Sequence, residues 1–178
     1  TLKKGDLITE DQLVKAQEIT KVGSWEGKFP SMDLTWSKEH YNIFEIDTEI
    51  PKEELFNAYR NKIHPDDVAE LDRQVNGAIE RGESFKYYHR VICKNNVIKY
   101  LFGKGDVIKN EEGQSIGAVG TVQDITAQTL LQEEVKKSEA NYIQLFNSAS
   151  DAIVVFDFNS KKIINVNKEA VSLLGYTK

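Results

Sequence analysis

The 178 residues contain 23 Lys and Arg against 28 Asp and Glu, for a net charge of −5, and 40% of them are hydrophobic. This apolar share suffices for a packed core, and an acidic chain without a basic stripe disfavours nucleic-acid binding, which needs clustered cations for phosphates. No apolar run reaches the roughly 18 residues that span a bilayer, and the single cysteine, Cys93, excludes an internal disulfide and a cysteine-based zinc cluster, so we expect neither membrane contact nor a metal site.

The first part of the chain predicts two helices and two short strands. Thr9 precedes one amphipathic run and Ser37 precedes a shorter one, and both residue types cap helices by accepting a backbone N–H. His40 falls in the second run, where we expect its side chain to be exposed. The expected elements are helices over residues 7–20 and 38–44 and strands over residues 25–29 and 34–36.

Two longer helices follow. Pro65 suits a first helical turn because it has no backbone N–H to leave unpaired. Asp66 and Asp67 complement the positive end of the helix dipole, so we interpret this acidic pair as a solvated helix start. His64 is interpreted as a cap or loop residue, because it and the two aspartates rarely converge on a metal within one turn. The helices are expected over residues 53–63 and 65–79.

The hydrophobic pattern then changes from a helical to an alternating period. Turns are expected at residues 94–96 and 110–113, where Asn and Gly tolerate left-handed backbone. Three strands joined by tight turns predict an antiparallel meander, with its second and third strands over residues 97–108 and 116–125. The face of the first strand that should point at the core carries Phe85, Tyr87, His89 and Val91.

Residues 126–148 return to a helical pattern with apolar positions spaced by four and three residues. This spacing is a heptad seam of about two heptads, and it fits both a two-stranded coiled coil and an ordinary amphipathic helix. The seam positions are Leu131, Val135, Ser138, Tyr142 and Leu145.

The C-terminal residues repeat the N-terminal pattern. Residues 164–174 match residues 34–44 at a shift of 130 positions, with Asn167 in the place of Ser37. A tandem repeat explains this match. Because the second copy stops before any equivalent of the long helix or the meander, we expect the chain to be a fragment of a longer multidomain protein.

The motifs together resemble a PAS domain with its C-terminal PAC motif. The resemblance covers about residues 20–126 and is closest to the subfamily with His-Pro-Asp-Asp before its long helix. Residues 144–178 resemble the first part of another PAS domain. Tyr100 and Asn96 depart from the usual Trp and Gly. The similar segments are residues 22–25, 36–37, 63–67, 85–90 and 120–126.

The resemblance implies an α+β fold: a five-stranded antiparallel sheet with helices over one face, flanked by N- and C-terminal amphipathic helices, and a cavity between sheet and helices. It also implies a homodimer through the flanking helices and an exit helix that carries the signal. The expected division is an N-terminal helix at 1–21, a sensor domain at 22–126, a linker helix at 127–147 and a truncated second domain at 148–178.

Site candidates follow from strand faces and from the resemblance. A small-molecule ligand would contact the inward face of the sheet. Helix packing is the alternative explanation for the small residues of the last strand. For His89, the alternative is a core histidine with a hydrogen-bond partner. Asp124 should accept hydrogen bonds from the start of the exit helix and so couple sheet to helix, with a plain N-cap as the alternative. The pocket candidates are Tyr87, His89, Ala118, Gly120 and Val122; the coupling candidates are Asp124, Ile125 and Thr126; the dimer seam is Leu131, Val135, Tyr142 and Leu145.

The sequence disfavours flavin and haem, the two cofactors that we considered because of the resemblance. Flavin photochemistry in the light-sensing branch of the family uses an Asn-Cys-Arg helix and a strand Gln, whereas Cys93 lies near a strand end and Val122 occupies the Gln position. Haem needs an axial ligand, usually His, and of the three histidines only His89 lies on a face directed at the core, where a core histidine with a hydrogen-bond partner is the favoured interpretation. The cofactor, if any, is unknown.

We therefore expect a non-catalytic sensory and dimerisation module of a cytoplasmic signalling protein. Nucleotide loops, Gly-x-Ser-x-Gly and His-Glu-x-x-His are absent from the sequence, and the acidic pairs lie in a helix start and a turn, which disfavours an enzyme. The parent protein is expected to be a sensor histidine kinase. The alternatives are a diguanylate cyclase or phosphodiesterase, and a structural spacer without a ligand.

Overall fold

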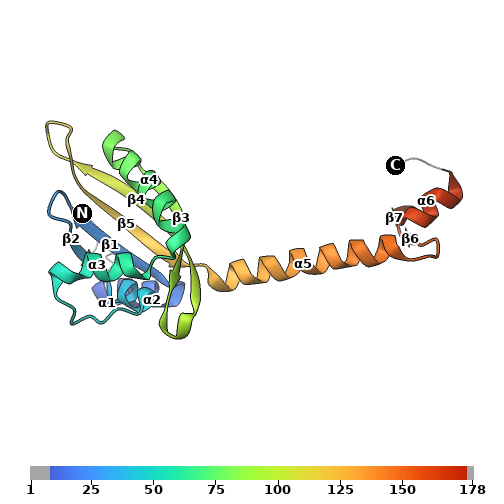
Figure 1. The fold of residues 1–178 in the computed structure, drawn as a ribbon, viewed down its shortest axis with the longest axis horizontal. Coiled ribbons are helices and arrows are strands. Elements are labelled where there is room, and N and C mark those ends of the chain that lie inside the picture. The colour runs from blue at the N-terminus through green and yellow to red at the C-terminus, as the bar shows by residue number, and fades with distance from the viewer. Residues whose placement is uncertain (1–8, 176–178) are drawn as a thin grey trace, which may run out of the picture. The chain divides into compact units, whose positions relative to one another are not determined.

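The computed structural model describes residues 9–175, which form two compact units that divide after Ala127. The first unit is a five-stranded antiparallel sheet in the order β2-β1-β5-β4-β3, with helices against it (Figure 1). The α+β class and the meander, which is the run β3, β4 and β5, are confirmed. The strands are β1 Val22–Lys28, β2 Asp33–Trp36, β3 Phe85–Ile92, β4 Ile98–Lys109 and β5 Ser115–Asp124.

The helices of this unit begin where local chemistry predicts. Thr9 Oγ1 accepts the Gln12 N–H at 3.3 Å, and the Gln12 side chain accepts the Thr9 N–H in return, which completes a capping box. His64 Nδ1 accepts the Asp66 N–H at 3.3 Å, so His64 is the cap that we predicted. The helices are α1 Glu10–Thr20, α2 Lys38–Phe44, α3 Lys52–Lys62 and α4 Pro65–Arg81.

The tight turns of the meander use the residues that the sequence indicates. A single 3₁₀ turn, η1 Lys94–Asn96, joins β3 to β4, and Asn95 and Asn96 both have φ of 57°. Gly113, in the turn between β4 and β5, has φ of 79°. Asn and Gly adopt this left-handed region at lower cost than other residues, so local sequence sets both turns.

Alternation along the strands gives the sheet one buried face, and two clusters of buried side chains cover it. Along β3, Tyr87 and His89 are buried whereas Lys86 and Tyr88 are exposed. Cluster 1 is Ile43, Phe44, Val91, Cys93, Leu101 and Val122, and cluster 2 is Ile63, Leu71, Ala78, Phe85, Tyr87 and Ala118.

The second unit repeats the start of the first. It contains most of α5 Thr126–Ser148, the two-stranded sheet of β6 Val154–Asp157 and β7 Lys162–Val166, and α6 Lys168–Leu174. No helix within residues 9–175 combines the length and the hydropathy that a membrane crossing requires.

Equivalent cap residues play the same double role in the two copies. Ser37 Oγ accepts the N–H groups of His40 at 3.3 Å and of Ser24 at 3.0 Å, so it joins α2 to β1. Asn167 Oδ1 likewise accepts the N–H groups of Ala170 and Ile153, both within 2.9 Å. This shared bonding pattern confirms that residues 164–174 repeat residues 34–44.

Candidate ligand-binding cavity

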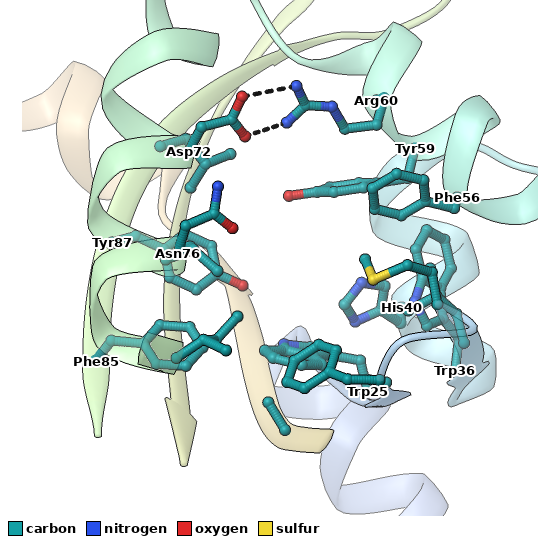
Figure 2. Close-up of a pocket in the computed structure, with 18 of the residues that line it drawn as sticks. Trp25, Trp36, His40, Phe56, Tyr59, Arg60, Asp72, Asn76, Phe85 and Tyr87 are labelled. Atoms are coloured by element: carbon teal, nitrogen blue, oxygen red, sulfur yellow. Dashed lines mark hydrogen bonds and ion pairs between the residues drawn. The ribbon is translucent and has the colours of Figure 1, made fainter. Parts of the chain in front are cut away.

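A cavity of about 270 Å³ lies in the first unit between the sheet and helices α2, α3 and α4 (Figure 2). Its floor is made of side chains from β1, β3 and β5, and two of them, Gly27 and Ala118, are small enough to leave space above the sheet. Large aromatic and aliphatic side chains supply most of the wall. The lining residues are Trp25, Gly27, Phe29, Met32, Leu34, Trp36, His40, Phe44, Phe56, Tyr59, Arg60, Leu71, Asp72, Val75, Asn76, Ile79, Phe85, Tyr87 and Ala118.

Two tyrosine hydroxyls supply polar groups inside this apolar space. Figure 2 shows Tyr59, from α3, and Tyr87, from β3, with their hydroxyls directed into the cavity. Burial raises the pKa of both hydroxyls above the ordinary value of tyrosine. Both therefore stay protonated at neutral pH, and each can donate one hydrogen bond and accept another.

One ion pair lies among the lining residues. Arg60, on α3, and Asp72, on α4, form a bidentate pair in which Nη2 and Oδ2 are 2.8 Å apart (Figure 2). Both side chains are partly exposed to solvent. Asn76 lies one turn beyond Asp72 on the same helix and places its amide beside the pair. The charges of the pair cancel, so the wall presents little net charge to the interior.

His40 also lines the cavity, and the expectation that it is exposed is wrong. Its side chain is 3% exposed, with its ring 4.2 Å from the Trp36 ring and 4.9 Å from the Phe44 ring. A Cβ built on Gly23 would lie 2.6 Å from His40 Cα, so glycine in β1 permits α2 to pack this closely. Burial, with a smaller contribution from His89, lowers the pKa of His40 to about 3, and the imidazole is neutral at physiological pH.

His89 lies in the core between the two clusters and does not line the cavity. Its ring stacks on Phe44 and lies edge-on to Tyr59, and neither ring nitrogen has a hydrogen-bond partner among the described residues. The predicted core position is confirmed, but the predicted partner is wrong. Burial lowers the pKa of His89 to about 4, although the nearby Asp67 carboxylate opposes the shift.

The pocket candidates of the last strand divide between different environments. Ala118 lines the cavity together with Tyr87, whereas Val122 packs in cluster 1. Gly120 faces Trp25 across the strand pair, and a Cβ on it would lie 2.1 Å from the Lys104 carbonyl oxygen and 2.7 Å from the Trp25 ring. Its small size therefore accommodates a tryptophan ring rather than a ligand or a helix.

Cluster 1 also contains Cys93, which we compared above with the reactive cysteine of the flavin-binding branch. The thiol is buried, and burial raises its pKa, so it stays protonated. Neither Cys93 nor Val122 is among the side chains that line the cavity.

The helical part of the cavity wall was missed by sequence reasoning. Helix α4 contributes Asp72 and Asn76 to the cavity wall. The two residues are four positions apart, and each follows an apolar lining residue, Leu71 or Val75. Polar residues that recur at helical spacing on the edge of an apolar stripe were the available signal. Their pairing with Arg60 on α3 carries no local signal, because the two residues come from different helices.

The coupling candidates form a bonded junction between β4, β5 and the start of α5. Asp124 Oδ1 accepts the Thr126 N–H at 2.9 Å and also the Thr126 hydroxyl. Tyr100, on β4, donates its N–H to Thr126 Oγ1 at 2.9 Å, and its carbonyl accepts the Ile125 N–H at 2.9 Å. Asp124 thus accepts hydrogen bonds from the first residue of the helix, as expected.

Asp67 is part of a second junction, and its interpretation as a solvated helix end is wrong. Asp67 Oδ2 accepts the backbone N–H of Arg90 at 2.7 Å and its Nε–H at 3.0 Å. The other carboxylate oxygen, Oδ1, accepts an N–H of Arg90 Nη2 at 2.6 Å. The side chain of Asp67 is 19% exposed, whereas that of Asp66 is 74% exposed. The Arg90 guanidinium holds the pKa of Asp67 below its usual range.

Known proteins share this architecture. The family model described as PAS fold matches residues 33–122, and one described as PAS domain matches residues 140–177. Sensor protein FixL of Bradyrhizobium diazoefficiens is 21% identical over 136 residues, which are 76% of this chain and 26% of FixL. The chain therefore spans about a quarter of the length of this relative.

Two solved structures support the fold. A sensory box histidine kinase/response regulator from Burkholderia thailandensis has a TM-score of 0.60 at 18% identity, and the match covers 75% of this chain and 98% of that one. The N-terminal domain of a diguanylate cyclase with PAS/PAC sensor from Marinobacter aquaeolei has a TM-score of 0.53 at 13% identity, with 61% and 98% covered. The sheet order, the tandem repeat and the match over half of its length show that this chain belongs to the PAS family.

Proposed function

We propose that this chain is a sensory module in which a small molecule occupies the cavity between the sheet and α2–α4. The cavity carries this proposal, because an apolar space with tyrosine hydroxyls directed into it fits an organic ligand. The Asp124–Thr126 junction is the proposed route to α5. It ties the first residue of α5 to β4, so a displacement of the sheet strains the start of the helix.

The proposed parent protein is a sensor histidine kinase, in which this segment has no catalytic role. The name of FixL and that of the Burkholderia protein support this choice, and the Marinobacter diguanylate cyclase is the basis of the alternative. The proposed module extends over residues 22–126, with a linker helix at 127–147 and the start of a second PAS domain from residue 148.

Filling the cavity should remove its occupant. Ala118 lies on the floor, whereas Val119, the next residue of β5, is on the opposite face of the sheet and exposed. Ala118→Leu should abolish ligand retention and cost about 1–3 kcal/mol in free energy of unfolding through overpacking. Native mass spectrometry of the protein purified from its host, followed by extraction and identification of any released molecule, measures the occupancy.

Val119→Leu is the matched control, since it enlarges the same strand on its other face, and it should retain the occupant. A protein that carries no small molecule, and that binds none from an extract of its host, would instead support the structural spacer. Equal retention by both variants would place any bound molecule outside this cavity.

We further propose that α5 forms a dimer seam with a second copy of the chain. The four apolar seam residues are between 50% and 71% exposed, and they recur at heptad spacing. The seam residues are Leu131, Val135, Tyr142 and Leu145.

A lysine in the seam should weaken this dimer. Val135→Lys places a charge between the two helices and should raise the dissociation constant about tenfold or more, as measured by analytical ultracentrifugation. Gln144→Lys adds the same charge on the opposite side of α5 and should leave the constant unchanged. Equal effects of the two variants, or a monomer at all concentrations, would refute the seam.

A further inference from the structure

We propose that the cavity selects a neutral, planar molecule of one or two rings that carries a hydrogen-bonding oxygen. This inference rests on the proposed function, because it specifies the chemical class of the molecule that the sensory cavity binds. Four properties of the cavity lead to it: its volume, its aromatic wall, its balanced charge and its two inward hydroxyls.

The volume limits the ligand to a small ring system. A dry cavity of about 150 Å³ lined by Leu, Ile and Phe holds one benzene molecule. The cavity of about 270 Å³ therefore has room for one substituted ring or two fused rings, and it is small for a flavin or a tetrapyrrole.

The wall favours a flat, aromatic shape. Trp25, from β1, and Phe85, from β3, lie side by side on the sheet with ring centroids 6.3 Å apart. Trp36, from β2, and Tyr59, from α3, meet edge-on at 6.1 Å. Ring faces and edges on both sides of the space offer stacking and edge-to-face contacts to a planar ring. A flexible chain cannot fully use these contacts.

The charge balance disfavours a charged ligand. Arg60 and Asp72 are the charged side chains of the lining, and they satisfy each other through a bidentate pair. His40 is buried against Trp36 and Phe44 and is neutral. A carboxylate or ammonium that entered would lose its hydration without meeting an unpaired counter-charge, which is costly.

The two hydroxyls indicate the polar group of the ligand. Tyr59 and Tyr87 approach the cavity from a helix and from the sheet, with both hydroxyls directed inward (Figure 2). A protonated phenol donates to a carbonyl or hydroxyl oxygen and also accepts from a hydroxyl or amide N–H. An oxygen on the ring system can therefore meet donors on both sides of the space.

Three molecules of the same shape and different charge test this class: benzamide, benzoate and benzamidine. Each is titrated into the full chain while ¹⁵N–¹H NMR records shifts of the amides on the cavity floor. Benzamide should bind at least about tenfold more tightly than either charged molecule, and 2-naphthamide more tightly than benzamide. Equal binding of all three, or binding of none, overturns the proposed class.

Unpairing the ion pair should reverse the preference. Asp72→Asn leaves the Arg60 guanidinium free and should strengthen benzoate binding about fivefold or more, whereas Arg60→Gln leaves the carboxylate free and should favour benzamidine. The double variant should restore the preference for benzamide. An unchanged order in both single variants contradicts the charge argument, and the wild-type series remains decisive if a variant fails to fold.

Removing one inward hydroxyl tests the polar contact. Tyr59→Phe should weaken the binding of benzamide about fivefold and leave the binding of toluene unchanged. Tyr88→Phe removes a hydroxyl from the exposed face of β3 and should change neither. The mass-spectrometric search for a bound molecule decides the sensory function separately: a charged occupant would leave that function standing and overturn only the ligand class.

Discussion

The free energy of unfolding should fall by about 3 kcal/mol between pH 7.5 and pH 5.5, because two buried histidines resist protonation in the folded state. Burial lowers the pKa of His40 to about 3 and that of His89 to about 4, against an ordinary value of 6.5. Over this interval the unfolded chain binds a proton at each site and the folded chain binds none. Stability must therefore rise with pH until the unfolded histidines have lost their protons.

Urea denaturation at several pH values measures this slope, and the chosen interval lies above the range in which ordinary carboxylates titrate. His89→Phe should remove about half of the slope, and the double variant with His40→Phe should remove nearly all of it. A slope that persists in the double variant would mean that other groups control the acid sensitivity.

Loss of the Asp67 carboxylate should be the most costly change in the His-Pro-Asp-Asp motif. Asp67→Ala leaves the backbone N–H and the guanidinium of Arg90 without their acceptor and should lower the free energy of unfolding by about 2–3 kcal/mol. Chemical denaturation with linear extrapolation measures the loss. Asp67→Asn keeps one acceptor oxygen, so its free energy of unfolding should lie between that of the wild type and that of the alanine variant.

The neighbouring aspartate provides the control. Asp66 is 74% exposed and lies 3.6 Å from Arg90 Nη2, so Asp66→Ala should cost no more than about 0.5 kcal/mol. Equal losses in Asp66→Ala and Asp67→Ala would mean that the helix dipole, rather than the bond to β3, makes this motif stabilising.

This pair shows where sequence interpretation succeeds and where it fails. Both aspartates occupy the first turn of α4, and a local rule correctly places both near the positive end of the helix dipole. The rule cannot tell which of them faces β3, because Arg90 is 23 residues away in the chain. The same limit explains the wrong expectation for His40, whose burial depends on the close approach of Gly23 in another element.

The candidate cavity was foreseen in part for the same reason. Period-two alternation correctly assigned Tyr87 and Ala118 to the inward face of the sheet, and both line the cavity. It assigned Gly120 and Val122 to that face as well, but Trp25 covers the glycine and cluster 1 encloses the valine. Strand alternation specifies which face a side chain occupies, and it contains no information about what lies above it.

Local patterns in the sequence were enough to predict the order of helices and strands, their caps and turns, the tandem repeat and the PAS fold, because these depend on residues a few positions apart or on recurring patterns along the chain. Tertiary packing was needed to reveal which side chains surround an open space, that Arg60 and Asp72 neutralise each other beside it, and that His40 is buried and uncharged. These properties arise when distant segments pack together, since burial and pairing depend on neighbours that the local sequence does not specify.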